Sequence, residues 1–466
     1  TNLIAIMLLL KLSTQTSAHE LPDSVSSPYK WVAGITALIF VLILGWNGYL
    51  AFPHQEELIA KAENPRWAVY DRYSPRGDIL ALSGEKLAEN TGESGSYQRR
   101  VTVPELSNTI GYALAGYGQS GIESSQYTIL RGYVGLSWQD RWLHERLYNQ
   151  PPPGLDIKTN LNLALQEQVD EFLGEQAGAV VILNADTGEI YAMASHPYFD
   201  ANELSQTWES LMSRTDAPLL NRATMGSYPI GTLITTVSLE SVWTTDSVTQ
   251  LSSDSDLIRL GPYCYQAMKN DGQVFCGLQY GCESTSEELL NFVDPTLLIN
   301  NLSEFGLFSA PDLAIQTGQP AVAPTVEALN QDPLQVMDLK VSPLQMALVA
   351  ATITNDGVRP APRLVNAYQT PAGNWQAMGE EKPDTVVMSA SIARRLRSEL
   401  VSSTHFLWYQ IGHALINNDQ SLTWYIGGTL SEWTGTPLAI AIAIEGNAPE
   451  LAQSIGGLLL TFSSAN

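Results

Sequence analysis

Basic residues and cysteines are the two shortages that first constrain this chain of 466 residues. Lys and Arg number 24 against 48 Asp and Glu, so the formal net charge is −24. A surface this acidic repels phosphate backbones and anionic headgroups, which disfavours nucleic-acid binding. Hydrophobic residues reach 44%, an ordinary value for a folded protein that excludes wholesale disorder. The length allows two or three domains.

Only three cysteines occur, and all fall within one short stretch as Cys264, Cys276 and Cys282. No histidine lies near them and no Cys-x-x-Cys pair occurs, so a zinc site is not expected. Neither a metal nor another cofactor is predicted. In an oxidising compartment an odd number of cysteines favours one disulfide and one free thiol, with the pairing left open.

Charged residues are absent from the segment between Trp31 and Phe52. At ~1.5 Å per residue this segment reaches about 30 Å, which matches the thickness of a bilayer core and predicts a transmembrane helix over 31–52. Lys30 precedes it and acidic residues follow it, which favours a cytoplasmic segment 1–30 and places the rest of the chain outside. The apolar run Leu3–Leu10 is too short to span, and it is either a signal-like segment or the end of an earlier helix.

Composition divides the rest of the chain at Pro151-Pro152-Pro153-Gly154, the clearest linker. The linker separates a stalk and small pedestal domain, 53–150, from a larger domain, 151–466. In the larger domain, helical periodicity over 160–174 predicts a helix capped by Asn160 and ended by Gly174. Short apolar runs predict strands over 177–183, 189–194, 422–427 and 437–445, and a closing helix over 448–460. The expected fold is α+β, with an antiparallel sheet between helical layers.

Seven phrases along the chain resemble class B penicillin-binding proteins of the FtsI and PbpA type, and they occur in the family's order. Two lie in the pedestal and five in the larger domain: Arg76–Ala88, Gly118–Gly132, Gly154–Gln166, Gly178–Asn202, Pro218–Ala223, Val341–Ala347 and Asn355–Val358. The resemblance implies a penicillin-binding transpeptidase fold on a single-pass anchor in a bacterial cell membrane. It also implies an integral membrane partner, for which a glycan polymerase of the FtsW or RodA type and another membrane complex both stay open.

The three short motifs of the family's active site are missing from their expected positions. Thr232 stands where the family has the nucleophilic serine, and Thr235 stands where it has the lysine that acts as the base. A threonine hydroxyl needs a base to become a nucleophile, and Thr235 cannot accept that proton. No Ser-x-Asn lies between Glu283 and Leu307, and His413 most nearly replaces the lysine of Lys-Thr-Gly. Ser-x-x-Lys matches at Ser27 and Ser83 fall outside the domain.

These substitutions predict a protein that is not an enzyme and that serves as a scaffold or accessory partner in a cell-envelope complex. Two alternatives stay open: an active peptidoglycan D,D-transpeptidase with an atypical site, and a non-covalent sensor of peptidoglycan or β-lactams. Loss of both lysines removes the charge that would bind a carboxylate. We therefore expect the vestigial pocket to be narrowed by Leu233, Ile234 and Leu415.

Overall fold

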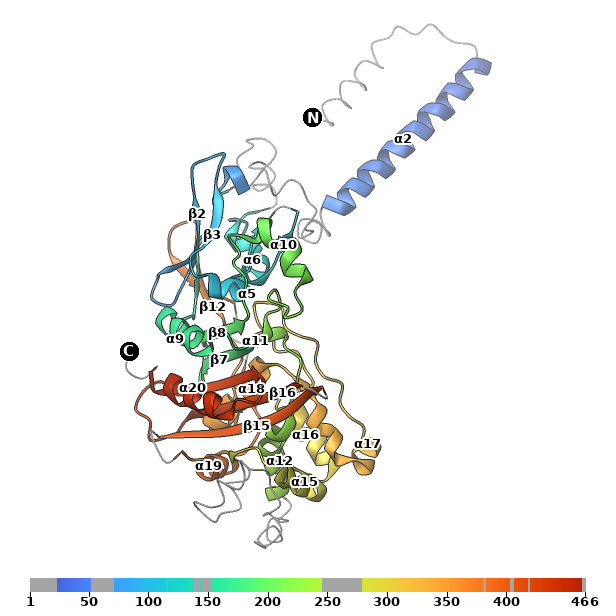
Figure 1. The fold of residues 1–466 in the computed structure, drawn as a ribbon. Helices are drawn as coiled ribbons and strands as arrows, with labels where there is room; N and C mark the ends of the chain where they lie inside the picture. Colours follow the sequence, from blue (N-terminus) through green and yellow to red (C-terminus); the bar gives the residue numbers. More distant parts are fainter. Residues whose placement is uncertain are drawn as a thin grey trace, which may run out of the picture. The chain divides into compact units, whose positions relative to one another are not determined.

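The computed structural model describes residues 23–51, 71–114, 116–137, 143, 152–244, 279–379, 383–402, 406–417 and 420–462 (Figure 1). The predicted stalk helix and the apolar run Leu3–Leu10 lie outside these residues. Contacts divide the chain into two units, Thr1–Asn64 and Pro65–Asn466. The predicted domain boundary at residue 151 falls inside the second unit and stays a prediction.

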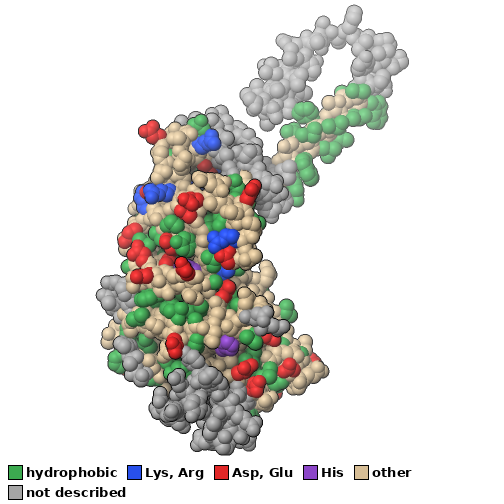
Figure 2. Space-filling view, viewed as in Figure 1, with side chains coloured by type: hydrophobic (Ala, Val, Ile, Leu, Met, Phe, Trp, Pro, Cys, Tyr) green, Lys and Arg blue, Asp and Glu red, His purple; other side chains and the backbone are tan. Residues whose placement is uncertain are grey.

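The first unit contains the predicted membrane helix. Helix α2 runs from Asp23 to Ala51, so it begins eight residues before the predicted start at Trp31. Within it, Trp31–Tyr49 is long and apolar enough to cross a bilayer, with 19 residues and a mean hydropathy of 1.8. The large apolar side chains of this stretch are exposed, as expected of a helix that packs against lipid (Figure 2).

A five-stranded antiparallel sheet forms the centre of the second unit. Its strand order is β15-β16-β17-β7-β8, so β15 is an edge strand. The strands have these bounds: β7 Gly178–Asn184, β8 Ile190–His196, β15 Leu407–Asn417, β16 Gln420–Thr429 and β17 Leu438–Glu445. Helix α18, Pro343–Thr354, packs on one face, and helices α9, Leu163–Leu173, and α20, Pro449–Phe462, pack on the other. The predicted α+β fold is confirmed.

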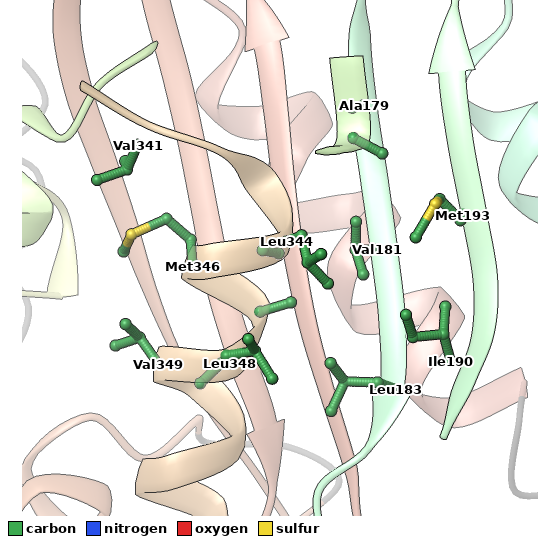
Figure 3. Packing of buried hydrophobic residues seen from close by; sticks show 14 of the residues in the cluster. Ala179, Val181, Leu183, Ile190, Met193, Val341, Leu344, Met346, Leu348 and Val349 are labelled. Atoms are coloured by element: carbon green, nitrogen blue, oxygen red, sulfur yellow. The ribbon is translucent and has the colours of Figure 1, made fainter. Parts of the chain in front are cut away.

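Strand alternation explains why both faces of the sheet are buried. Along β17, Ala439, Ala441 and Ala443 belong to the core that includes α18, whereas Ile440, Ile442 and Ile444 pack with α9 and α20. Side chains of a strand point to opposite faces in turn, so the small residues let α18 approach closely while the large residues fill the other layer. Figure 3 shows the α18 side, where Leu344 and Leu348 face the β7 side chains Val181 and Leu183.

Helix α9 departs from its prediction at the N-terminus. Asn162, and not Asn160, is its cap, because the Asn162 side chain accepts a hydrogen bond from Leu165 N at 3.2 Å. Asn160 is buried and donates to the carbonyl oxygen of Arg363 instead. At the other end Gly174 follows the last helical residue, as predicted, and it has a positive φ of 53°.

A second sheet runs from the pedestal into the larger domain, with the order β13-β12-β6-β1-β2-β3. The pedestal contributes β1 Ile79–Leu80, β2 Lys86–Thr91 and β3 Gln98–Val101. Residues beyond the Pro-rich linker contribute β6 Ile157–Thr159, β12 Val365–Gln369 and β13 Trp375–Ala377. Because β1 pairs in parallel with β6, backbone hydrogen bonds fasten the pedestal to the larger domain.

The pedestal encloses one carboxylate among arginines. Glu123 is fully buried and lies 2.7 Å from Arg76 Nη2 and 2.6 Å from Arg99 Nε. Burial alone would raise the pKa of Glu123, but these two guanidinium groups hold it below its ordinary value. Arg76, the first residue of the first pedestal phrase, is therefore held by an ion pair with Glu123. Removal of Glu123 would leave the buried charge of Arg76 uncompensated.

A buried histidine joins α9 to the end of β8. His196 Nδ1 lies 2.7 Å from the carbonyl oxygen of Gly174, and its Nε2 lies 2.9 Å from Asp170 Oδ1. Both of these oxygens only accept hydrogen bonds, so both ring nitrogens carry protons and the imidazole is charged. Burial alone would lower the pKa of His196, but the hydrogen bonds to Asp170 and Gly174 raise it above its ordinary value.

Candidate functional site

The segment that leads to the family's nucleophile position is fixed by aromatic packing. Strand β9, Tyr228–Pro229, pairs with β10, Lys340–Val341. Trp424 of β16 donates from its indole Nε1 to the Pro229 carbonyl oxygen at 2.8 Å, and its ring meets Tyr228 edge to face at 6.1 Å. The 3₁₀ turn η3, Gly231–Leu233, and helix α12, Ile234–Thr244, therefore begin at a defined place beside the sheet.

Thr232 lies in η3 and is hydrogen-bonded to the edge strand. Its side chain is buried, and Oγ1 accepts from the backbone N–H of His413 at 2.9 Å. Close approach of the turn to β15 requires glycine at position 231, because a Cβ there would lie 2.1 Å from the His413 carbonyl oxygen. Gly231 also has a φ of 57°, which favours glycine. The hydroxyl thus joins the turn to β15.

Thr235 takes part in a buried network of neutral groups. Its Oγ1 donates to the Thr232 carbonyl oxygen at 2.8 Å and accepts from Gln410 Nε2 at 3.0 Å. The other end of the Gln410 amide accepts from the hydroxyl of Thr236. Gln410, Thr235 and Thr236 are all buried, so α12 and β15 are held together by hydrogen bonds without charge.

Gln410 is a residue of the site that the sequence did not predict. His413, which was expected to replace the lysine of Lys-Thr-Gly, has an exposed side chain and reaches Thr232 only through its backbone N–H. Gln410 stands two residues before Gly412, at the spacing of lysine and glycine in Lys-Thr-Gly, and its side chain points to Thr235. Side chains two residues apart on a strand lie on the same face, so counting back two residues from Gly412 along the edge strand would have identified Gln410.

Apolar side chains close the space around the turn, in part as expected. Leu233 and Ile234 are fully buried, and Leu233 lies against Gly412, where a Cβ would be 2.5 Å from the leucine Cγ. Leu415 is 58% exposed, so its predicted part in filling the pocket is wrong. It follows Ala414, the last buried residue of β15, in a part of the strand that is exposed or half-buried.

A second segment covers Thr232 from the side of α15, Glu283–Phe292. A Cβ at Gly281 would lie 2.9 Å from Thr232 Oγ1 and 2.6 Å from the Ile411 carbonyl oxygen, so only glycine permits this approach. The next residue, Cys282, is buried and disulfide-bonded. Its partner lies outside the described residues, as do Cys264 and Cys276, so the pairing stays a prediction.

Further along α12, Glu240 is a half-buried carboxyl group. Burial and the nearby carboxylate of Glu304 raise the pKa of Glu240 to about 7. Thr232, Thr235 and Thr236 form hydrogen bonds with backbone and amide groups in the part of the chain that the structure describes. Within those same residues, no three His, Cys, Asp or Glu side chains gather as metal ligands. The hydrogen bonds described for these three hydroxyls therefore involve neutral groups.

Comparison with known families identifies two regions of the chain. Residues 178–405 match the penicillin binding protein transpeptidase domain, and residues 76–157 match the penicillin binding protein A dimerisation domain. Together these matches cover well over half of the chain. The chain belongs to the class B penicillin-binding protein family.

Individual relatives agree with this assignment. The chain is 25% identical to "Peptidoglycan D,D-transpeptidase PbpA" of Mycobacterium tuberculosis, over 91% of this chain and 94% of that protein. It is 26% identical to the protein of the same name from Mycolicibacterium smegmatis, over 73% and 75%. The solved structure of PBPA from M. tuberculosis covers 83% of this chain and 99% of its own, with a TM-score of 0.69 and 21% identity.

These comparisons correct the expectation that the chain is not an enzyme. That prediction is wrong on this finding, because relatives that match most of the chain are named as peptidoglycan D,D-transpeptidases. The chain also shares its fold with the M. tuberculosis protein solved as an imipenem acyl-enzyme complex, with a TM-score of 0.67 and 21% identity. The prediction rested on three short motifs and gave no weight to the pedestal and the remaining fold, which the family shares.

Proposed function

We propose that the chain is a membrane-anchored partner subunit of a peptidoglycan-synthesising complex, in which its penicillin-binding fold serves as a scaffold. The observation that carries the proposal is the joining of η3 and α12 to β15. Thr232 binds the His413 N–H, and Thr235 binds the Gln410 amide, so the elements that hold the family's motifs are fastened by neutral hydrogen bonds. A domain braced in this way offers a rigid outer surface for contact.

The membrane helix and the pedestal are the parts that we expect to meet the partner. Both are present, as α2 and as the sheet that pairs β1 with β6. The partner is an integral membrane protein, and a glycan polymerase of the FtsW or RodA type is the family's example. Acidic side chains outnumber basic ones on the face that Figure 2 shows, which favours a partner whose envelope-facing surface is basic.

The globular unit lies on the outer side of a bacterial cell membrane in this proposal. Lys30 before the span and acidic residues after it support that orientation. The disulfide at Cys282 supports it as well, because disulfides persist in oxidising compartments. Protease added to intact spheroplasts should degrade residues 65–466. Protection of this unit until the cells are lysed would contradict the orientation.

Co-purification from the native membrane tests the proposed role. Full-length chain carrying an affinity tag should recover a polytopic membrane protein in a fixed ratio. The matched control replaces Trp31–Tyr49 by an unrelated apolar helix of equal length, which keeps the anchor and removes its specific face. Recovery of the same protein by both forms in equal amounts would contradict a contact through the membrane helix.

A second function, an atypical D,D-transpeptidase, is favoured by the names of the relatives and by the place of Thr232 in η3, directly before α12. Thr232 would be its nucleophile, with activation from a group other than Thr235. This function predicts a stoichiometric adduct on Thr232 when the protein is incubated with a fluorescent penicillin and weighed by intact-mass spectrometry. Labelling that persists in Thr232→Val would contradict it.

A further inference from the structure

A pocket on the α18 side of the larger domain is lined by residues that the motif-bearing site does not use. Its volume is about 200 Å³, and it lies among the end of helix α16, Pro295–Glu304, helix α18 and the short pair β11, Val358–Arg359, with β14, Thr385–Val386. Its walls are mainly apolar, with Phe305, Leu348 and the rings of four prolines. An apolar cavity of about 150 Å³ holds a molecule the size of benzene, so this one accepts a body of amino-acid size.

One cation lines the pocket. The Arg359 guanidinium lies against Gly306, where a Cβ would be 1.9 Å from Nη1, so a side chain at position 306 would displace it. Burial lowers the pKa of Arg359, and the described residues offer it neither an ion pair nor a hydrogen-bond acceptor. Arg359 is half-buried, and even a partly desolvated guanidinium without a partner is costly. It is also unexpected in a chain whose acidic residues outnumber its basic residues two to one.

Arg359 could have a structural role as a cap for the carbonyl groups at the end of α16, but the contacts do not fit this role. Gln345 already does so, because its side-chain amide donates to the carbonyl oxygens of Gly306, Leu307 and Ser309 at 3.1–3.3 Å. The donors of Arg359 are therefore left for a group inside the pocket.

We propose that this pocket binds a small carboxylate with an apolar body of amino-acid size, and that Arg359 holds the carboxylate. The planar fork of a guanidinium matches two carboxylate oxygens, and the proline rings and Leu348 cover the apolar part. Asp312 also lines the pocket and already interacts with another group, and its negative charge disfavours a dianion such as phosphate. The proposal stands apart from the scaffold role, because Thr232 and its partners take no part in it.

Titration of the full-length protein in detergent micelles, observed by ligand NMR, tests the site. The probes are N-acetyl-D-alanine, N-acetyl-L-alanine, the two matching amides, and inorganic phosphate. Both acids should bind with roughly millimolar affinity and the amides at least tenfold more weakly, because a charge-assisted hydrogen bond is lost. Arg359→Met should weaken the acids about ten- to a hundredfold, whereas Arg100→Met, at an exposed pedestal arginine, should leave them unchanged.

Arg359→Lys is a second test of the site that does not depend on whether Arg359→Met folds. It keeps the charge but loses the two-pronged geometry, so its affinity should fall between wild type and Arg359→Met. Equal affinity of acids and amides, or unchanged affinity in either Arg359 variant, would overturn the proposal. Binding of phosphate without the acids, or no binding of any acid at about 50 mM, would overturn it too.

Discussion

Removing the hydroxyl of Thr235 tests the network that joins α12 to β15. Thr235→Val keeps the shape of the side chain but takes away the acceptor of Gln410 Nε2 and the donor to the Thr232 carbonyl oxygen. The site is buried, so water does not replace the lost partner of the amide N–H. An unsatisfied buried donor costs about 1–3 kcal/mol, and we expect Thr235→Val to lose about 2–3 kcal/mol of unfolding free energy.

A double-mutant cycle separates the network from a general packing defect. Gln410→Leu removes the amide, so adding it to Thr235→Val leaves no orphaned Nε2 donor behind. The double variant should therefore be about 1 kcal/mol more stable than the sum of the two single losses predicts. Urea unfolding of the full-length protein in micelles, followed by tryptophan fluorescence, measures all three. Thr434→Val, at an exposed loop position, is the control and should change nothing.

Two outcomes would refute this reasoning. The first is a loss of less than about 0.5 kcal/mol of unfolding free energy in Thr235→Val, which is within the range of ordinary surface substitutions. It would mean that the Thr235 hydroxyl does not hold the Gln410 amide. Strictly additive single losses would mean that Thr235 and Gln410 act independently, whatever their distance.

Three further predictions concern buried charges. Glu123→Gln should cost about 3–5 kcal/mol in thermal unfolding, because it leaves guanidinium groups buried without their carboxylate. The pKa of His196 is raised in the folded state, so its contribution to folding stability is complete below about pH 6.5 and is lost as the pH rises through the folded pKa. In His196→Gln the melting temperature should therefore fall less steeply above about pH 7 than in wild type. The folded pKa of Glu240 is raised to about 7, so the wild-type protein loses stability as the pH rises toward 7. At about pH 8 Glu240→Gln should be about 1–2 kcal/mol more stable than wild type, after allowance for solvent screening. At about pH 4 this difference should be absent.

Each of these has a contradicting result. Glu123→Gln that melts with the wild-type protein would mean that the pedestal arginines need no counter-charge. A wild-type melting temperature that stays level between about pH 6 and 9 would contradict a charged His196. A stability difference between Glu240→Gln and wild type that does not change with pH would show that the carboxyl does not titrate on unfolding.

Much of the sheet could be read from the sequence because its strands carry strong local signals. The alternation of alanine and isoleucine in β17 and the unbroken apolar run of β7 are visible without a structure. The cap of α9 could not be fixed in the same way. Asn160 and Asn162 are both good caps by type, and only the contact of Asn160 with the Arg363 carbonyl oxygen decides between them.

The candidate site was only partly predictable, because its partners come from distant segments. Thr232 and Thr235 are located by the phrase that precedes them. Gln410 and Gly281 are brought to them only by the pairing of β15 in the sheet and by the segment before α15. A sequence shows which residue types are missing from a motif, but it does not show which neutral groups occupy the space that they leave.

Position-resolved crosslinking in the native membrane tests the central proposal most directly. A photo-reactive residue is placed at each position from 31 to 49 in turn, within the part of α2 that can span the bilayer. Contact with one partner along one helical face predicts adducts to a single membrane protein, repeating about every 3.6 residues. Adducts to lipid alone at every position, or protein adducts without that period, would contradict a partner subunit held through its membrane helix.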